Sequence, residues 1–434
     1  MAFKDERRTL LSSSARIQVP WIKVTIGNYT FGVYSETRTK ERDKDGFYFD
    51  ALSVQYPNYV QRLDIVKING QVNQYTLSLS YPVTQYDDPN FFEKVFSSVS
   101  KTREIKFSYG DMSLPNYVYR EEKAIITKVS SNFQLPSTVI NYTVSAVSSA
   151  ALNAGQSFTF QGTTDRPSNV IRKVFLNQNY GLQSLFKGMT LSNLPYLLGD
   201  GHDKVVKIEP KRNISAFDYI LYLTSCMIPD TTVVDGYAST DIYVLTVHDD
   251  ATLDEDYRDD LAKGGSYFKI ERVSYKTNKS DAMQIDIGFG NTGTIVTAFS
   301  VIDDENYSLL YDYNETLGIS PYVERLNKDG EWVTEWSPQL TSKNMRGKTH
   351  SSDMTWWTQI TKFPIKATIT LQGLIRPAIL MTYVRLNVIF PGGRKHIASG
   401  LYLITQQRDS IDGTGYRTTL GLTKIAGDND EFTM

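Results

Sequence analysis

The sequence contains few of the residues from which catalytic and metal sites are usually built. It has one cysteine, Cys226, in 434 residues, which excludes a disulfide within the chain and fits a protein made in a reducing cytoplasm. Its four histidines are scattered without zinc-binding spacing, and no Gly-x-Ser-x-Gly nucleophile motif occurs. The histidines are His202, His248, His350 and His396. We therefore expect no catalytic residue, no cofactor and no metal.

Charge and hydropathy argue against two further classes of protein. The 46 basic and 48 acidic side chains nearly cancel, so bulk electrostatics gives no reason to expect a protein that coats nucleic acid. No apolar run approaches the roughly 18–20 residues of a membrane-spanning helix, so we expect no membrane span. Residues 1–16 are charged and lack the apolar core of a secretory signal, and we expect them to form a polar arm.

Three local motifs have both a functional and a structural interpretation. Residues 248–260 are acidic but lack the spacing of a calcium loop, which favours a solvated turn over a cation site. Residues 288–293, "GFGNTG", resemble a phosphate loop, but no Lys-Ser/Thr follows, so punctuation between strands is favoured. Trp356 and Trp357 form a candidate partner surface, since adjacent tryptophans lie more often in a core or protein interface than in a carbohydrate site.

Alternation with period two dominates the rest of the chain. The 28 tyrosines and 20 phenylalanines favour strands over helices. The clearest hairpin spans residues 62–82 and turns near Asn69-Gly70, a preferred two-residue turn. Its second arm alternates large residues with small polar ones. The small polar residues are Gln74, Thr76, Ser78 and Ser80.

The pattern predicts a mainly β fold with an α+β insert. We expect a first β-barrel domain at 17–150, with one embedded helix starting near Asp88 and Pro89. Residues 151–167 are small and polar, as in a linker. Helical and strand patterns mix in a middle domain at 168–283. A second β-barrel domain follows at 284–434, and it contains a Trp-rich insertion near 305–362.

An internal similarity links the two β-rich parts. Residues 124–148 and 400–425 share one design. In each, we expect a first strand that ends in Ile-Thr, then a polar turn, and then a second strand with a tyrosine at its start and alternating threonines and aliphatic residues. Because β-hairpins converge easily, the similarity leaves a true duplication and a chance likeness equally open.

The order of these parts resembles the baseplate hub family of bacteriophage tails, which is related to the N-terminal body of type VI secretion spike proteins. Three segments carry the resemblance: "SAFDYILYLTSCM", "GNTGTIVTAFSVIDD" and the ending "RLNVIFPGGRKHIASGLYLITQQRDSIDGTGYRTTLGLTKI". The resemblance is architectural over most of the chain and motif-like only in the last 45 or so residues. Residues 38–46 and 305–362 have no counterpart that we identify.

The resemblance implies two similar tube-forming barrels per chain, each with an associated helix, and a homotrimer whose six barrels form a ring. Such a structural hub joins a sixfold tail tube, or its initiator, to a threefold central spike or tip protein. It contacts the tape-measure protein in some tails, leaves a channel for DNA in transit, and resides in the virion baseplate after synthesis in the bacterial host cytoplasm. A tail-associated cell-wall hydrolase stays open as an alternative, because paired catalytic carboxylates are defined by their separation in space. A distal tail adaptor that binds receptor-binding fibres also stays open.

The same resemblance gives roles to polar faces of the predicted strands. The channel-facing candidates are Gln74, Thr76, Ser78 and Ser80 in the first barrel and Arg385 and Asn387 in the second. A channel that passes DNA without holding it should be neutral or acidic, so Arg385 needs a carboxylate partner. The candidates for an inter-subunit edge are Arg417, Thr419 and Thr423, because an exposed strand edge needs cover.

Overall fold

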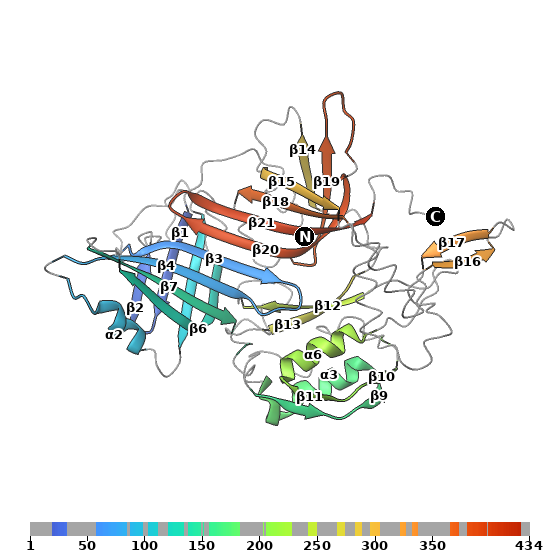
Figure 1. Ribbon diagram of the computed structural model, residues 1–434, viewed down its shortest axis with the longest axis horizontal. Helices are drawn as coiled ribbons and strands as arrows, with labels where there is room; N and C mark the ends of the chain where they lie inside the picture. The colour runs from blue at the N-terminus through green and yellow to red at the C-terminus, as the bar shows by residue number, and fades with distance from the viewer. Residues whose placement is uncertain are drawn as a thin grey trace, which may run out of the picture.

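The computed structural model describes part of the chain, and the fold there is mainly β, as predicted (Figure 1). The described residues are 20–32, 58–84, 87–98, 103–111, 120–133, 138–148, 151, 156–182, 203, 205–227, 242–249, 267–273, 283–288, 296–303, 322–326, 332–336, 365–372, 380–396 and 398–426. Among them, no helix is both long and apolar enough to cross a lipid bilayer.

The elements form a first β unit, a middle unit and a second β unit. The first unit comprises β1 (Pro20–Ile26), β2 (Tyr29–Gly32), β3 (Val60–Ile68), β4 (Gln74–Pro82), α2 (Phe91–Ser98), β5 (Glu104–Asp111), β6 (Arg120–Phe133) and β7 (Val139–Ser148). The middle unit comprises β8 (Phe158–Phe160), β9 (Thr163–Asp165), α3 (Pro167–Leu176), η2 (Gln178–Tyr180), β10 (Val206–Ile208), β11 (Lys211–Ile214), α6 (Ala216–Ser225), β12 (Ile242–His248) and β13 (Tyr267–Val273). The second unit comprises β14 (Met283–Gly288), β15 (Val296–Asp303), β16 (Tyr322–Leu326), β17 (Trp332–Trp336), β18 (Ile365–Gln372), β19 (Tyr383–Ile389), β20 (Gly400–Asp412) and β21 (Gly415–Ala426).

One sheet of 13 strands runs through both β units. Its main path is β15-β18-β21-β20-β3-β4-β7-β6-β5-β1-β2, and β14 and β19 branch from it beside β20. The joint is the antiparallel pairing of β20 with β3, from Gln406 opposite Ile68 to Asp412 opposite Arg62. Figure 1 shows β20 and β21 running along β3 and β4. What the structure shows is therefore one sheet shared by the two units, and the division into two barrels stays a prediction.

Within this sheet, two blocks of four strands have the same order. In the first block the order is β3-β4-β7-β6, and in the second it is β15-β18-β21-β20. Each block has its first two strands in chain order and its last two reversed. The predicted similarity between residues 124–148 and 400–425 thus corresponds to hairpins β6–β7 and β20–β21, at equivalent places in the two blocks.

The equivalent strands also share irregularities. In β6 and β20 the register shifts at Thr127 and Thr405. Each hydroxyl donates to a carbonyl of the partner strand, that of Ser145 at 3.1 Å and that of Gly421 at 3.3 Å. The first strands of the two blocks shift register as well, between Val60 and Arg62 and between Val296 and Ala298. Since β-bulges are specific features of a fold, their matched positions support a duplication.

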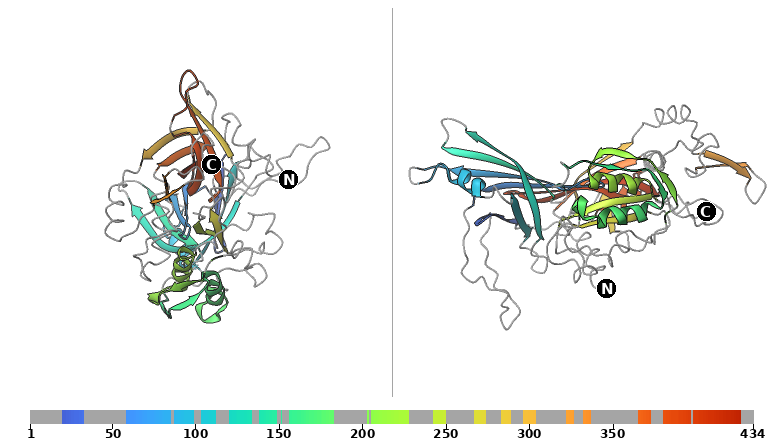
Figure 2. Two further views of the ribbon diagram at one scale, coloured as in Figure 1. Left: turned by 90° about the vertical axis from the view of Figure 1, so that its right-hand side faces the viewer. Right: turned by 90° about the horizontal axis from the view of Figure 1, so that it is seen from below.

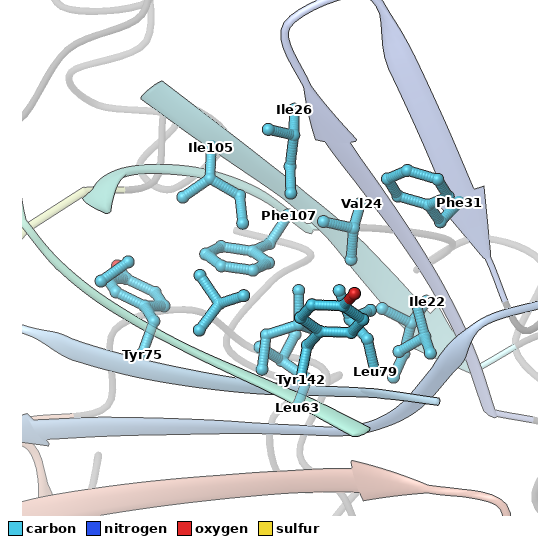
Figure 3. Close-up of a cluster of buried hydrophobic side chains, with 14 of the residues drawn as sticks. Ile22, Val24, Ile26, Phe31, Leu63, Tyr75, Leu79, Ile105, Phe107 and Tyr142 are labelled. Carbon is cyan, nitrogen blue, oxygen red and sulfur yellow. The ribbon is translucent and has the colours of Figure 1, made fainter. Parts of the chain in front are cut away.

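Three hydrophobic cores lie under and beside the sheet. The first is enclosed by β1, β3, β4, β5, β6, β7 and α2, and Figure 3 shows side chains of β1 and β5 meeting those of β3, β4 and β7. The second core fills the second β unit, and the third lies between α3, α6, β12 and β13. The hairpin β20–β21 contributes to two of them. Leu403 and Leu420 belong to the core of the second unit, whereas Ile411 and Tyr416 at its tip belong to the core of the first.

The structure corrects one expectation about the domains and leaves another untested. The predicted linker 151–167 contains β8 and β9, which pair with β11 and β10 of the middle unit, so its second half belongs to that unit. The small residues there form short strands because they pair within a compact α+β unit. The predicted helix of the second barrel stays a prediction: the elements described in 284–434 are strands, and residues 304–321 and 337–364 lie outside the described residues.

The middle unit docks on the first β unit through the turn between β3 and β4. The amide of Gly70 donates to the carbonyl of Leu245 at 2.8 Å, and Asn73 Nδ2 donates to the carbonyl of Val247 at 3.3 Å. Gly70 has a φ of +68°, and a Cβ there would lie 3.1 Å from Leu221 Cδ1. Glycine is needed at this turn for both its left-handed backbone and the close approach of α6. Figure 2 shows the three units from two further sides.

Candidate channel and assembly surface

The candidate surface is the polar face of the eight-stranded part of the sheet, from β6 to β15. It exists because residues alternate along each strand. In β4, Tyr75, Leu77 and Leu79 are buried in the core of the first unit, while Gln74 and Thr76 are exposed on the opposite face. Ser78 and Ser80 lie on the same face and are partly exposed. The predicted alternation of β4 is therefore what the structure shows.

The register extends this face across both units. Thr76 is in register with Ser145 and Asp64, Asp64 with Ser410, and Ser410 with Arg417. We call the following residues the polar face: Lys128, Ser130, Asn132, Asn141, Thr143, Ser145, Gln74, Thr76, Ser78, Ser80, Arg62, Asp64, Arg408, Ser410, Asp412, Arg417, Thr419, Lys366, Thr368, Thr370 and Gln372. Four of the predicted channel residues thus share one surface with two residues that were predicted at an inter-subunit edge.

Three arginines of the polar face pair with two aspartates. Asp64 accepts from Arg62 Nε at 2.6 Å and lies 3.5 Å from Arg408 Nη2, while Arg417 Nη2 lies 3.2 Å from Asp412 Oδ2. Exposed ion pairs of this kind contribute little to stability. They do neutralise positive charge that would otherwise meet phosphate groups.

The carboxylate of Asp412 is held in its charged form. Partial burial acts to raise its pKa, but hydrogen bonds from Thr414 and the nearby Arg417 lower it below the ordinary value. The ion pair with Asp64 similarly raises the pKa of Arg62. Asp412 and Arg62 are therefore both ionised at neutral pH. The polar face thus carries the negative charge of Asp412 together with the positive charge of Arg62.

The open strand edge predicted at Arg417, Thr419 and Thr423 is not an edge. These residues lie on β21, which pairs with β20 on one side and with β18 on the other. Thr419 Oγ1 lies 3.1 Å from Thr370 Oγ1 of β18. Sequence reasoning placed this strand at the edge because the pairing partner β18 precedes it by about 50 residues and leaves no local signal.

Arg385 and Asn387 lie on β19, which is not one of the eight strands. Arg385 is in register with Leu401, at the start of β20 before its bulge. Asn387 is 9% exposed and donates from Nδ2 to Asp286 Oδ1 at 2.6 Å. The structure does not bring either residue onto the polar face, and a carboxylate partner for Arg385 stays a prediction.

The residues equivalent to the β4 candidates lie on β18 instead. Matching the two blocks aligns Gln74, Thr76, Ser78 and Ser80 with Lys366, Thr368, Thr370 and Gln372. Sequence reasoning missed this set. A signal was available, because "QYTLSLS" at 74–80 and "KATITLQ" at 366–372 share the same alternation of Thr or Ser with aliphatic residues.

A buried polar cluster lies behind the polar face, inside the first unit. Glu122 is fully buried, and its Oε1 accepts from Lys67 Nζ and Tyr109 Oη, both at 2.6 Å. Its Oε2 accepts from Tyr75 Oη, also at 2.6 Å. Burial would raise the pKa of Glu122, but the Lys67 charge and these hydrogen bonds lower it below its ordinary value. Glu122 is thus a buried carboxylate stabilised in its charged form.

Asp249, at the end of β12, joins this cluster to the middle unit. Its carboxylate accepts from Asn73 Nδ2 at 2.8 Å and from Ser148 Oγ at 2.6 Å, and it lies 3.1 Å from Tyr75 Oη. Burial, together with the charges of Asp249 and Glu122, raises the pKa of Tyr75 well above its usual value. Asp249 therefore serves as a structural connection, whereas residues 250–260 of the predicted acidic turn lie outside the described residues.

Among the residues that the structure describes, no group of three His, Cys, Asp or Glu residues is placed to hold a metal ion. Trp356 and Trp357 lie outside the described residues. Cys226, the C-cap residue of α6, is buried and forms no disulfide.

Comparisons with solved structures identify similar folds. A tail protein from Neisseria meningitidis matches with a TM-score of 0.45 and 10% identity, covering 94% of this chain and 98% of the other. The 43 kDa tail protein of prophage MuSo2 from Shewanella oneidensis matches at 0.44 and 10% identity, covering 94% and 100%. An Escherichia coli component of the type VI secretion system, described as similar to the T4 bacteriophage tail proteins gp27 and gp5, matches at 0.40 and 10% identity, covering 85% and 74%.

These structures belong to the two groups that the sequence resemblance named, phage tails and type VI secretion. No protein-family model matches the chain, and no curated protein matches it.

Proposed function

We propose that this chain is a structural hub of a phage tail baseplate. It works as a homotrimer that joins a sixfold tail tube or tube initiator to a threefold central spike or tip protein. The trimer leaves a channel for DNA, contacts the tape-measure protein, and resides in the virion tail after synthesis in the host cytoplasm. The proposal assigns the chain no enzymatic activity.

The observation that carries this proposal is the repeat of one four-stranded block within one continuous sheet. Two equivalent blocks per chain give six equivalent blocks in a trimer. A threefold assembly then presents a near-sixfold ring of strands to a sixfold tube, while its outer parts keep threefold symmetry. This is a direct structural means of joining partners of different symmetry.

The polar face supports the assignment of a channel lining. Its side chains are small and neutral over β4 and β7, and Arg62, Arg408 and Arg417 are paired with aspartates. Unpaired Lys and Arg would bind phosphate through counterion release, with a log–log salt slope of about −0.9 per phosphate neutralised. Pairing of the arginines reduces the basic charge that a duplex would meet, although Lys128 and Lys366 of the polar face are not part of these pairs.

Two measurements test the proposal. Native mass measurement of the purified chain should give a trimer, and imaging should show a ring with a central opening. Quantitative mass spectrometry of purified tails should give three copies per particle. Six copies at the distal end would instead indicate a distal adaptor, and release of labelled peptidoglycan fragments by the purified chain would indicate a hydrolase. Either result overturns the hub assignment.

A further inference from the structure

A group of buried polar side chains lies between the core of the first β unit and the core of the middle unit. We call this group the polar seam, and each of its members is at most 4% exposed. The members are Lys67, Asn73, Tyr75, Glu122, Ser148 and Asp249. Among the described residues of the first unit, Val72 is the one hydrophobic side chain that packs against the core of the middle unit. The two units therefore meet largely through polar groups.

The turn at residues 69–73 covers one edge of β12. Among the described strands, β12 pairs with β13 alone. The carbonyls of Leu245 and Val247, two residues apart on β12, accept from Gly70 N at 2.8 Å and from Asn73 Nδ2 at 3.3 Å. An uncovered strand edge is a site of pairing with another strand. The turn thus occupies an edge that would otherwise be open.

Asp249 holds the end of β12 against β4 and β7. Its carboxylate accepts from Ser148 Oγ at 2.6 Å and from Asn73 Nδ2 at 2.8 Å, and it lies 3.1 Å from Tyr75 Oη. Hydrogen bonds to a carboxylate are roughly twice as strong as those between neutral groups. The seam therefore supplies a large share of the contact between the two units.

The second block of the sheet has no equivalent of the polar seam. Matching the strands and bulges of the two blocks aligns Lys67 with Asp303, Tyr75 with Ala367, and Glu122 with Gly400. Alanine and glycine have no polar side chain, so the second block cannot form the same network. The seam is thus an addition to the first block, at the place where that block contacts the middle unit, and the repeated sheet does not require it.

Separation of the units would leave few polar groups of the first unit without a partner. Tyr75 Oη would still donate to Glu122 at 2.6 Å, and the amide of Ser148 would still donate to the carbonyl of Asn73 at 2.9 Å. Water would reach the remaining groups, among them the carboxylate of Asp249. Because a polar group is costly only where it is buried without a partner, the contact is of a kind that can open and close.

We propose that the polar seam is a latch, from which the middle unit is released as a whole and onto which it docks again with both hydrophobic cores intact. In the closed arrangement the turn at 69–73 covers the edge of β12. In the open arrangement that edge is available to another strand. The device goes beyond the hub function, because one chain contains every group that it needs.

Ser148→Ala in the full-length chain tests the latch, because it removes the hydroxyl that donates to Asp249. The matched control is Ser145→Ala, on the same strand but on the opposite face of the sheet. Hydrogen exchange of the Gly70 amide reports the contact between the units, and exchange of amides in β4–β7 reports the first core. Labelling of the thiol of Cys226, which is buried at the C-terminal end of α6, reports the fold of the middle unit.

We expect Ser148→Ala to speed exchange of the Gly70 amide at least about tenfold, because a hydrogen bond to a charged group is lost. Labelling of Cys226 and exchange in β4–β7 should stay within about twofold of the wild type, and Ser145→Ala should leave all three probes within about twofold. A parallel rise in Cys226 labelling would show that the middle unit unfolds instead of undocking, and it would overturn the proposal. An unchanged Gly70 amide would overturn it too, since the seam would then not hold the unit.

A second pair of variants removes a single hydroxyl from β4. Tyr75→Phe takes away the group that lies between Glu122 and Asp249, whereas Tyr81→Phe removes a hydroxyl that donates to the carbonyl of Asp88 at 3.0 Å. Tyr75→Phe should speed Gly70 exchange at least about threefold more than Tyr81→Phe does, again without faster labelling of the middle unit. Equal effects of the two variants would contradict the latch. Copy number in purified tails tests the hub function separately.

Discussion

Breaking the buried ion pair of the first unit should cost a large part of its stability. In Glu122→Gln the Lys67 ammonium would stay buried without its counter-charge. The two side chains are 0% and 5% exposed, respectively. Removing one partner of such a pair costs about 3–5 kcal/mol, because the remaining charge is uncompensated.

The double variant Lys67→Met with Glu122→Gln removes both charges together. The double variant should lose less free energy of unfolding than Lys67→Met and Glu122→Gln lose together, by at least about 2 kcal/mol, since neither charge is left buried without its partner. Native-state hydrogen exchange of amides in β3–β7 is the suitable assay, because a chain of several units does not unfold in one step. An interaction free energy below about 0.5 kcal/mol between the two substitutions would refute the argument that each of these buried charges depends on the other.

The same cluster predicts a pH dependence. The pKa of Glu122 is lowered in the folded chain. Its ionised form therefore adds to the free energy of unfolding above the unfolded carboxyl pKa of about 4.3, and this contribution is lost as the pH falls through the folded pKa. Wild-type protection of β3–β7 should therefore decline on acidification below about pH 4, and Glu122→Gln should show a smaller decline. Equal acid sensitivity of the two proteins would contradict the assignment of this charge.

Three further variants probe the fold. Ile411→Ala should cost about 2–4 kcal/mol and increase exchange in β1 and β5 more than in β14 and β19, because this hairpin tip fills the first core. Gly70→Ala should cost about 1–2 kcal/mol, since its φ is +68° and Leu221 lies 3.1 Å from the added Cβ. Limited proteolysis of the middle unit would report this loss, and Gly413→Ala, whose Cβ meets nothing within 4 Å, should resist cleavage like the wild type. Thr419→Pro should cost at least about 3 kcal/mol in thermal unfolding, because β21 is paired on both sides, whereas Thr419→Val should stay near the wild type.

Local structure could be predicted wherever it depends on neighbouring residues. The alternation in β4, the turn at Asn69-Gly70 and the helix α2 follow from spacing within about ten residues. The same holds for the apolar stripe of α3, where Val170, Ile171 and Val174 are buried. In each case the physical cause is the periodicity of the element itself.

Pairing over long distances could not be predicted in this way. The contact of β3 with β20 joins residues more than 300 positions apart, and no local pattern encodes it. Alternation also assigns charged residues to solvent, so it could not find Lys67 and Glu122 in a core. There Lys67 donates to Glu122, and Glu122 also accepts from two tyrosine hydroxyls. The candidate surface was therefore found in part: β4 from its own pattern, and β18 only after the sheet was known.

The hairpin β20–β21 has a consequence for the order in which the chain acquires its structure. It is the last described segment to leave the ribosome, yet Ile411 and Tyr416 complete the core of the first unit, whose other strands, Pro20–Ile26 to Val139–Ser148, are made long before Gly400–Asp412. The first unit therefore keeps part of its apolar interior open until residues 400–426 have been made. Non-local pairing of this kind slows folding and exposes intermediates to aggregation. A chain broken off before residue 400 would lack these two side chains and would leave part of the core of the first unit uncovered.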